Sequence, residues 1–155
     1  MRCEVFPRFL NQRIRYNPVM NEDTIEKSIT INAPVEKVWR VFIDPSLSSE
    51  MDGKYITDWK VGGSFDWAGN DGKIYSRGTL LAFEKNVLIS HDIYDAQDNG
   101  DMRSTITYRF TAQGNKTILT VTEGQIDDLD EDECEDIAED WSETLKEIKK
   151  VAEKL

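Results

Sequence analysis

The C-terminal stretch 130–155, DEDECEDIAEDWSETLKEIKKVAEKL, decides the fold. Its apolar residues recur at steps of three and four, which places them on one stripe of a helix: Ile137, Trp141, Leu145, Ile148, Ala152 and Leu155. Acidic residues and lysines occupy the other side. At about 1.5 Å per residue such a helix is roughly 35 Å long, the width of a small domain. It needs a wide apolar surface to lie on, and we expect the rest of the chain to provide one.

The region between Tyr55 and Glu123 alternates apolar and polar residues in short runs that are typical of β-strands. Glycine, asparagine and aspartate separate these runs, as in tight turns. Gly78 lies within one run and indicates a bulge or close packing. We predict strands at 55–59, 64–68, 74–84, 87–94, 102–112 and 117–123. Consecutive hairpins of this length form an antiparallel meander that must curl.

One further strand and a helix precede this meander. The alternation over Thr24–Asn32 predicts a half-buried strand. After Ala33-Pro34 the apolar spacing becomes helical up to Phe42, with Asn32 as the expected cap, and Asp44-Pro45 ends the helix. Residues 46–51 add a short helical turn. The predicted class is α+β: a helix grip, in which a curved antiparallel sheet of about six to seven strands wraps on the long C-terminal helix, with one or two short helices after the first strand.

Residues 1–22 differ from the rest because they contain four arginines and no clear period. We expect them to form a disordered extension or an over-extended start, followed by a single helix-grip domain over 23–155. Two other interpretations are an extra packed segment and a targeting arm.

Composition limits the partners. The 155 residues carry a net charge of −11, which repels nucleic acid and anionic membranes. No apolar run approaches the ~20 residues of a membrane span. Cys3 and Cys134 lie in unlike contexts and suggest no disulfide framework, and no secretory signal is evident. We therefore predict a cytoplasmic monomer.

Several motifs resemble one known family. The run 29–39, ITINAPVEKVW, looks like the opening of helix-grip proteins of the START and birch-pollen-allergen superfamily. Residues 57–65, TDWKVGGSF, followed by Asp71-Gly72 and 78–80, GTL, resemble the subgroup related to the activator of the ninety-kilodalton heat-shock protein ATPase. Gly124 and 141–145, WSETL, also fit.

The resemblance implies a cavity between the sheet and the long helix, and it implies no single activity because fold does not determine function. Three functions follow as hypotheses. The first is binding of a hydrophobic small molecule without catalysis. The second is a chaperone-associated or stress-related interaction module. The third is a cyclase- or hydrolase-like enzyme using His91, and we expect a binding protein rather than an enzyme.

The candidate ligand-binding residues are aromatic, or lie on the expected inner faces of strands and helix. Trp141 lies in the middle of the closing helix, and His91, the only histidine, is in phase with Ile89 and Ile93. The predicted site comprises Trp141, Tyr108, His91, Trp67, Tyr75 and Leu145.

We predict neither a metal nor a cofactor. One histidine without a neighbouring reactive cysteine cannot build a usual zinc site or a triad. The acidic run 127–136 has Glu133 where a calcium loop starting at Asp128 requires glycine. Its acids are better explained as a helix cap and as charges that complement the helix dipole.

Overall fold

The computed structural model describes residues 23–95, 103–126 and 131–155, so the extension predicted at 1–22 lies outside the described part. Helices and strands follow in the order β1 (Asp23–Ile31), α2 (Val35–Ile43), α3 (Pro45–Ser48), a 3-10 turn (Ser49–Met51), β2 (Gly53–Thr57), β3 (Phe65–Gly69), β4 (Ile74–Arg77), β5 (Leu80–Glu84), β6 (Leu88–Asp95), β7 (Arg103–Gln113), β8 (Lys116–Ile126) and α4 (Glu131–Glu153). None of the described helices is both long and apolar enough to cross a membrane.

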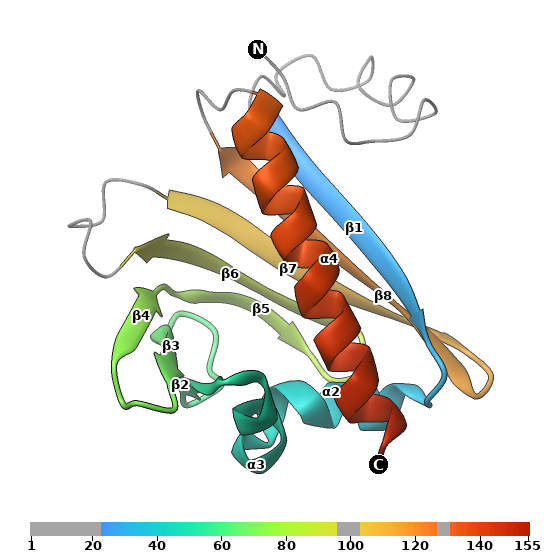
Figure 1. Cartoon of the computed structure of the whole chain (residues 1–155). Helices are drawn as coiled ribbons and strands as arrows, with labels where there is room; N and C mark the ends of the chain where they lie inside the picture. Colours follow the sequence, from blue (N-terminus) through green and yellow to red (C-terminus); the bar gives the residue numbers. More distant parts are fainter. Residues whose placement is uncertain (1–22, 96–102, 127–130) are drawn as a thin grey trace.

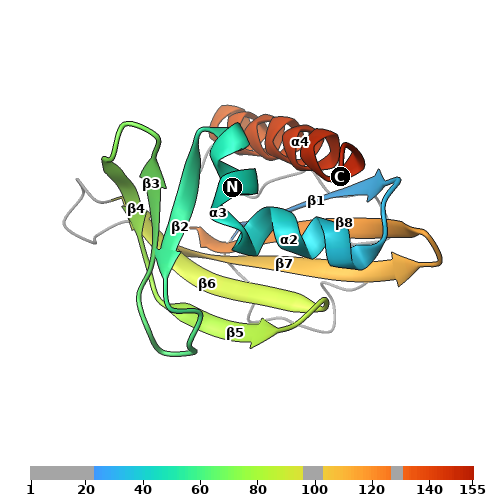
Figure 2. The same ribbon diagram turned by 90° about the horizontal axis from the view of Figure 1, so that it is seen from below.

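The strands form one antiparallel sheet. Its order is β1-β8-β7-β6-β4-β3-β2, and β5 also pairs with β6. Helix α4 crosses the sheet diagonally (Figure 1), and the β2–β3–β4 end curls up beside the helices (Figure 2). The predicted α+β helix-grip fold is confirmed, although the sheet has 8 strands rather than six to seven.

Gly78 accounts for the additional strand. The run 74–84, predicted as one strand, is divided into β4 and β5 around this residue. A Cβ atom at Gly78 would lie 2.0 Å from the carbonyl oxygen of Asp92, so only glycine fits there. The Asp92 carboxylate also accepts a 2.7 Å hydrogen bond from the Thr79 amide. The structure has the close packing predicted at Gly78, and this packing also interrupts the strand.

The core lies between the sheet and the inner stripe of α4. That stripe packs against inward residues of β1 and α2 and includes three residues that the predicted pattern omitted, Cys134, Ala138 and Val151. Leu145, Ile148 and Ala152 are buried as their spacing predicts. Cys134 is buried on this stripe, and the other cysteine of the sequence, Cys3, lies outside the described residues.

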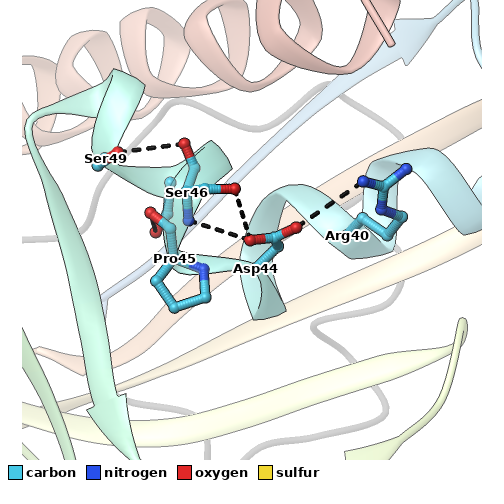
Figure 3. A network of polar contacts seen from close by, with 6 residues as sticks. Arg40, Asp44, Pro45, Ser46 and Ser49 are labelled. Carbon is cyan, nitrogen blue, oxygen red and sulfur yellow. Dashed lines mark hydrogen bonds and ion pairs between the residues drawn. The ribbon is translucent and has the colours of Figure 1, made fainter.

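The connection from β1 to α3 depends on short polar contacts. Asn32 does not cap α2, because Pro34 holds the cap position. The backbone N–H of Asn32 instead donates to Glu153 Oε2 at 2.7 Å. Asp44 links α2 to α3, because its carboxylate accepts from the amide and the hydroxyl of Ser46 and lies 3.8 Å from Arg40 (Figure 3). Phe42 of α2 packs edge-on against Tyr108 and Phe110 of β7, with ring centroids 4.8 and 5.2 Å apart.

Candidate functional site

A pocket of about 470 Å³ lies between α4 and the concave face of the sheet. Its walls come from α2, the 3-10 turn, β2, β3, β4, β6, β7, β8 and α4, so it forms only when the sheet has curled around the helix. Aromatic side chains dominate its lining: Phe42, Tyr55, Phe65, Trp67, Tyr108 and Trp141.

Trp141 is held in the pocket wall by a carboxylate. Its indole Nε1–H donates to Glu123 Oε1 at 2.7 Å, and the Ser104 hydroxyl donates to Glu123 Oε2 at 2.7 Å. The Trp141 ring also meets the Tyr108 ring edge-on, with centroids 5.9 Å apart. The position of the indole is therefore determined by contacts with β7 and β8 as well as by α4.

Two tyrosine hydroxyls meet inside the pocket. Tyr55 donates to the Tyr108 hydroxyl at 3.5 Å. Burial raises the pKa of Tyr55 to about 12 and raises that of Tyr108 well above its usual value. Both phenols are neutral at physiological pH, the Tyr108 hydroxyl keeps its hydrogen for donation to a guest molecule, and the Tyr55 oxygen can accept a hydrogen bond.

His91 lies in the pocket wall on β6 and is only 3% exposed. Its Nδ1 is 2.9 Å from the carbonyl oxygen of Asp92, and because a carbonyl only accepts, Nδ1 carries the hydrogen. Burial lowers the pKa of His91 to about 4, so the ring is neutral at pH 7 and Nε2 is an acceptor. This Nε2 atom is buried and has no hydrogen-bond partner among the described residues.

The structure brings four of the predicted site residues together around the pocket: Trp141, Tyr108, His91 and Trp67. It places the other two elsewhere. Tyr75 is 49% exposed on β4, and its hydroxyl donates to the Asp71 carboxylate. Leu145 lies on the inner side of α4 and is buried in the core. The abundance of aromatic residues predicted an aromatic pocket, but it could not show that Tyr75 faces outward. The strand β4 is too short for its alternation to show which of its two faces points inward.

The acidic residues of the pocket were not predicted from the sequence. Asp66, Glu123, Asp140 and Glu147 all line it. The signal for Glu123 was present, because it continues the inward-facing alternation of Leu119 and Val121 and a charge on a buried face is unusual. Asp140 and Glu147 carried no such signal, since they lie on a helix with acids over most of its outer surface.

The fold and the pocket define a protein of the helix-grip class. Residues 32–153 match the model of the family described as "Activator of Hsp90 ATPase homolog 1-like protein", and the chain belongs to that family. The resemblance noted in the sequence is thereby confirmed. No match to this chain was found among curated proteins.

Solved structures share the fold. A Cytophaga hutchinsonii protein is 25% identical, with a TM-score of 0.71 over 84% of this chain and 94% of its own. CalU16 of Micromonospora echinospora is 19% identical, with a TM-score of 0.68 over 84% of this chain and 76% of its own. An Hsp90 activator from Plasmodium falciparum is 20% identical, with a TM-score of 0.63 over 77% of this chain and 88% of its own.

Proposed function

We propose that this protein binds an apolar small molecule with one or two polar atoms in the pocket between α4 and the sheet. The observation that carries this proposal is the aromatic lining around a buried acceptor, His91 Nε2, that has no partner among the described residues. Buried polar atoms are normally satisfied, so an unpartnered one beside a pocket favours a guest that supplies the missing hydrogen.

The size and polarity of the pocket support the same function. Its volume of about 470 Å³ falls within the range of roughly 300–1,000 Å³ that is usual for small-molecule sites. The hydroxyls of Tyr55 and Tyr108 add two polar atoms beside the aromatic rings of the wall. Such a site suits a flat or elongated apolar body whose orientation is set by a few hydrogen bonds.

The state of His91 favours binding over catalysis. General acid–base catalysis works best when the pKa of the group lies near the operating pH. A pKa of about 4 makes His91 a weak base and leaves it without a transferable proton at neutral pH. The imidazole therefore serves better as a fixed hydrogen-bond acceptor than as a proton carrier.

A variant that fills the pocket tests the proposal. Thr144 lines the pocket from α4, one turn after Trp141, whereas its neighbour Glu143 is exposed on the outer side. Affinities of a panel of sterols, fatty acids and flat aromatics are measured by calorimetry for the wild type, Thr144→Phe and Glu143→Phe. We expect at least one panel member to bind the wild type and Glu143→Phe equally, and Thr144→Phe at least about tenfold more weakly.

Two results would contradict the proposal. One is the absence of measurable binding by every class in the panel. The other is equal binding by the wild type and a folded Thr144→Phe protein, which would place the ligand outside the pocket. Amide spectra of both variants establish that each retains the fold.

Family membership favours a second candidate function, action on the chaperone Hsp90. The test is the ATPase rate of purified Hsp90 with and without this protein. If the chaperone is the partner, the rate rises, and Thr144→Phe acts as the wild type does because its substitution lies in the pocket. An unchanged rate together with no complex on a sizing column would rule out this function.

A further inference from the structure

The pocket lining is rich in acidic groups. Four of its residues are carboxylates, Asp66, Glu123, Asp140 and Glu147, and no lysine or arginine among the described residues lines it. Arg77 lies outside the lining and pairs with Asp66 at 3.3 Å, and the other three carboxylates have no cationic partner in the described part of the chain. Asp140 and Glu147 are exposed, so they mark the side where solvent reaches the pocket.

Glu123 is the lining carboxylate that joins β8 to Trp141 of α4. It is half-buried, and its two hydrogen bonds come from Trp141 and Ser104, both of which are neutral donors. Neutral donors position a carboxylate without cancelling its charge. Among the described residues of the lining, His91 is the only basic side chain, and it is uncharged at neutral pH because burial lowers its pKa. The described part of the wall therefore carries negative charge that no positive side chain within it offsets.

The aromatic rings complement that charge. Tyr108 meets Trp141 at an interplanar angle of 77°, and Tyr55 meets Trp67 at 69°. Rings set nearly perpendicular to one another present faces in more than one direction, as the walls of a box do. Aromatic faces attract cations through their quadrupole, most strongly for tryptophan, and such boxes recognise alkylated ammonium groups.

We propose that the pocket takes an organic cation, a ligand with an apolar ring-containing body and an ammonium group held between the aromatic rings and the carboxylate of Glu123. This inference rests on the proposed function and specifies its ligand class. The unpartnered Nε2 acceptor of His91 suits such a ligand, because an ammonium group or a second polar atom brings hydrogens and needs no donor from the wall. The net charge of −11 draws cations toward the protein.

Three probes with one naphthyl body test the charge preference: 1-naphthylmethylammonium, 1-naphthalenemethanol and 1-naphthaleneacetate. Dissociation constants are measured at pH 7 from the amide and indole signals in NMR titrations. We expect the ammonium probe to bind about tenfold more tightly than the alcohol at low salt, and the acetate to bind most weakly. Added salt should reduce this preference. The reduction should be smaller than for binding at exposed carboxylates, because salt screens charges inside a pocket less than charges on the surface.

Matched variants locate the charge. Glu123→Gln keeps the shape and an acceptor for Trp141, whereas Glu139→Gln removes the same charge from an exposed position of α4 outside the lining. The expected ratio of alcohol to ammonium dissociation constants falls about fivefold in Glu123→Gln and stays unchanged in Glu139→Gln. Unchanged alcohol binding shows that Glu123→Gln is folded, and Glu147→Gln supplies a second lining variant if it is not.

Each alternative result is decisive. If the alcohol binds as tightly as the ammonium probe, the cation inference is overturned while the proposed small-molecule function stands. If none of the probes and none of the broader panel binds, both fail. If the ammonium probe shifts acidic surface residues without shifting the indole signals of Trp67 and Trp141, its binding is a surface effect and the inference is overturned.

Discussion

The indole N–H of Trp141 and the carboxylate of Glu123 are joined by a 2.7 Å hydrogen bond that ties the middle of α4 to β8. The Ser104 hydroxyl on β7 holds the other carboxylate oxygen at 2.7 Å. One glutamate thus joins the closing helix to two strands and supplies a half-buried carboxylate to the pocket wall. A bond that crosses from the helix to the sheet should contribute to stability as well as to the shape of the site.

Removing the indole donor should weaken that link. Trp141→Phe keeps an aromatic ring in the wall but leaves Glu123 Oε1 without its partner, and we expect a loss of about 1–3 kcal/mol in the free energy of unfolding. Urea denaturation measures it. A double-mutant cycle with Glu123→Leu, which removes the acceptor, isolates the bond, and the two effects should be non-additive by about 0.5 kcal/mol or more. Strict additivity would mean that the hydrogen bond contributes nothing.

Stability should depend on pH through His91. Its pKa is about 4 in the folded protein against 6.5 for an exposed histidine, so the unfolded state binds more protons between these values. Stability therefore rises with pH in this window: the contribution is complete above about pH 6.5 and is lost as the pH falls toward 4, on the order of 3 kcal/mol in all. His91→Gln cannot titrate, and the difference between the two stability curves isolates the imidazole from the carboxylates.

The imidazole signal provides a direct check, because the chain has 1 histidine. In NMR spectra of the folded protein its ring protons should keep the chemical shift of the neutral form down to about pH 5. A titration midpoint near 6.5 would show that the ring is solvated, and it would remove the basis for the expected pH dependence.

Gly78 should not tolerate a side chain. A Cβ at this position would lie 2.0 Å from the Asp92 carbonyl oxygen, so Gly78→Ala must push β4 and β5 away from β6. We expect a loss of about 3 kcal/mol or more, measured by thermal or urea unfolding. Gly124→Ala is the matched control, because its Cβ would meet Thr24 only at 3.8 Å, and its cost should stay below about 1 kcal/mol. Equal effects at the two glycines would contradict the packing described at Gly78.

Thr117 should matter through its hydroxyl. This fully buried side chain donates to the Ala33 carbonyl oxygen at 2.8 Å, joining β8 to the turn before α2. Thr117→Val keeps the shape but leaves the carbonyl without this donor, and we expect a loss of about 1–2 kcal/mol. Thr117→Ser keeps the bond and removes one methyl group, which should cost about 1 kcal/mol. A harmless Thr117→Val would show that the carbonyl is satisfied in another way.

Periodicity accounts for most of the fold that could be predicted. The stripe through Trp141, Leu145 and Ile148 required an extended surface, and the alternation around Leu119 and Val121 provided it, because burial on one face imposes a period on each element. Gly78 showed its close packing in the sequence but not the break in the strand. That break depends on Asp92, which lies in the next predicted strand, 87–94, so no pattern within 74–84 indicates it.

The pocket was predictable only in part, because it depends on how elements distant in sequence meet. Trp141, Tyr108, His91 and Trp67 were found from aromatic character and phase, whereas Tyr75 and Leu145 needed the actual direction of each side chain. Asn32 illustrates the same limit at a helix start, since the nearby Pro34 takes the cap position and Glu153 binds the Asn32 amide from the far end of the chain.

The most direct measurement of small-molecule binding in the pocket uses the indole N–H signals of the tryptophans. Trp67 and Trp141 line the pocket, whereas Trp39 is buried in the core outside its lining. During titration with a ligand that binds, we expect the Trp67 and Trp141 signals to shift with one common dissociation constant while the Trp39 signal stays in place. Binding that leaves the Trp67 and Trp141 signals unmoved, or that moves all of them equally, would contradict a site between α4 and the sheet.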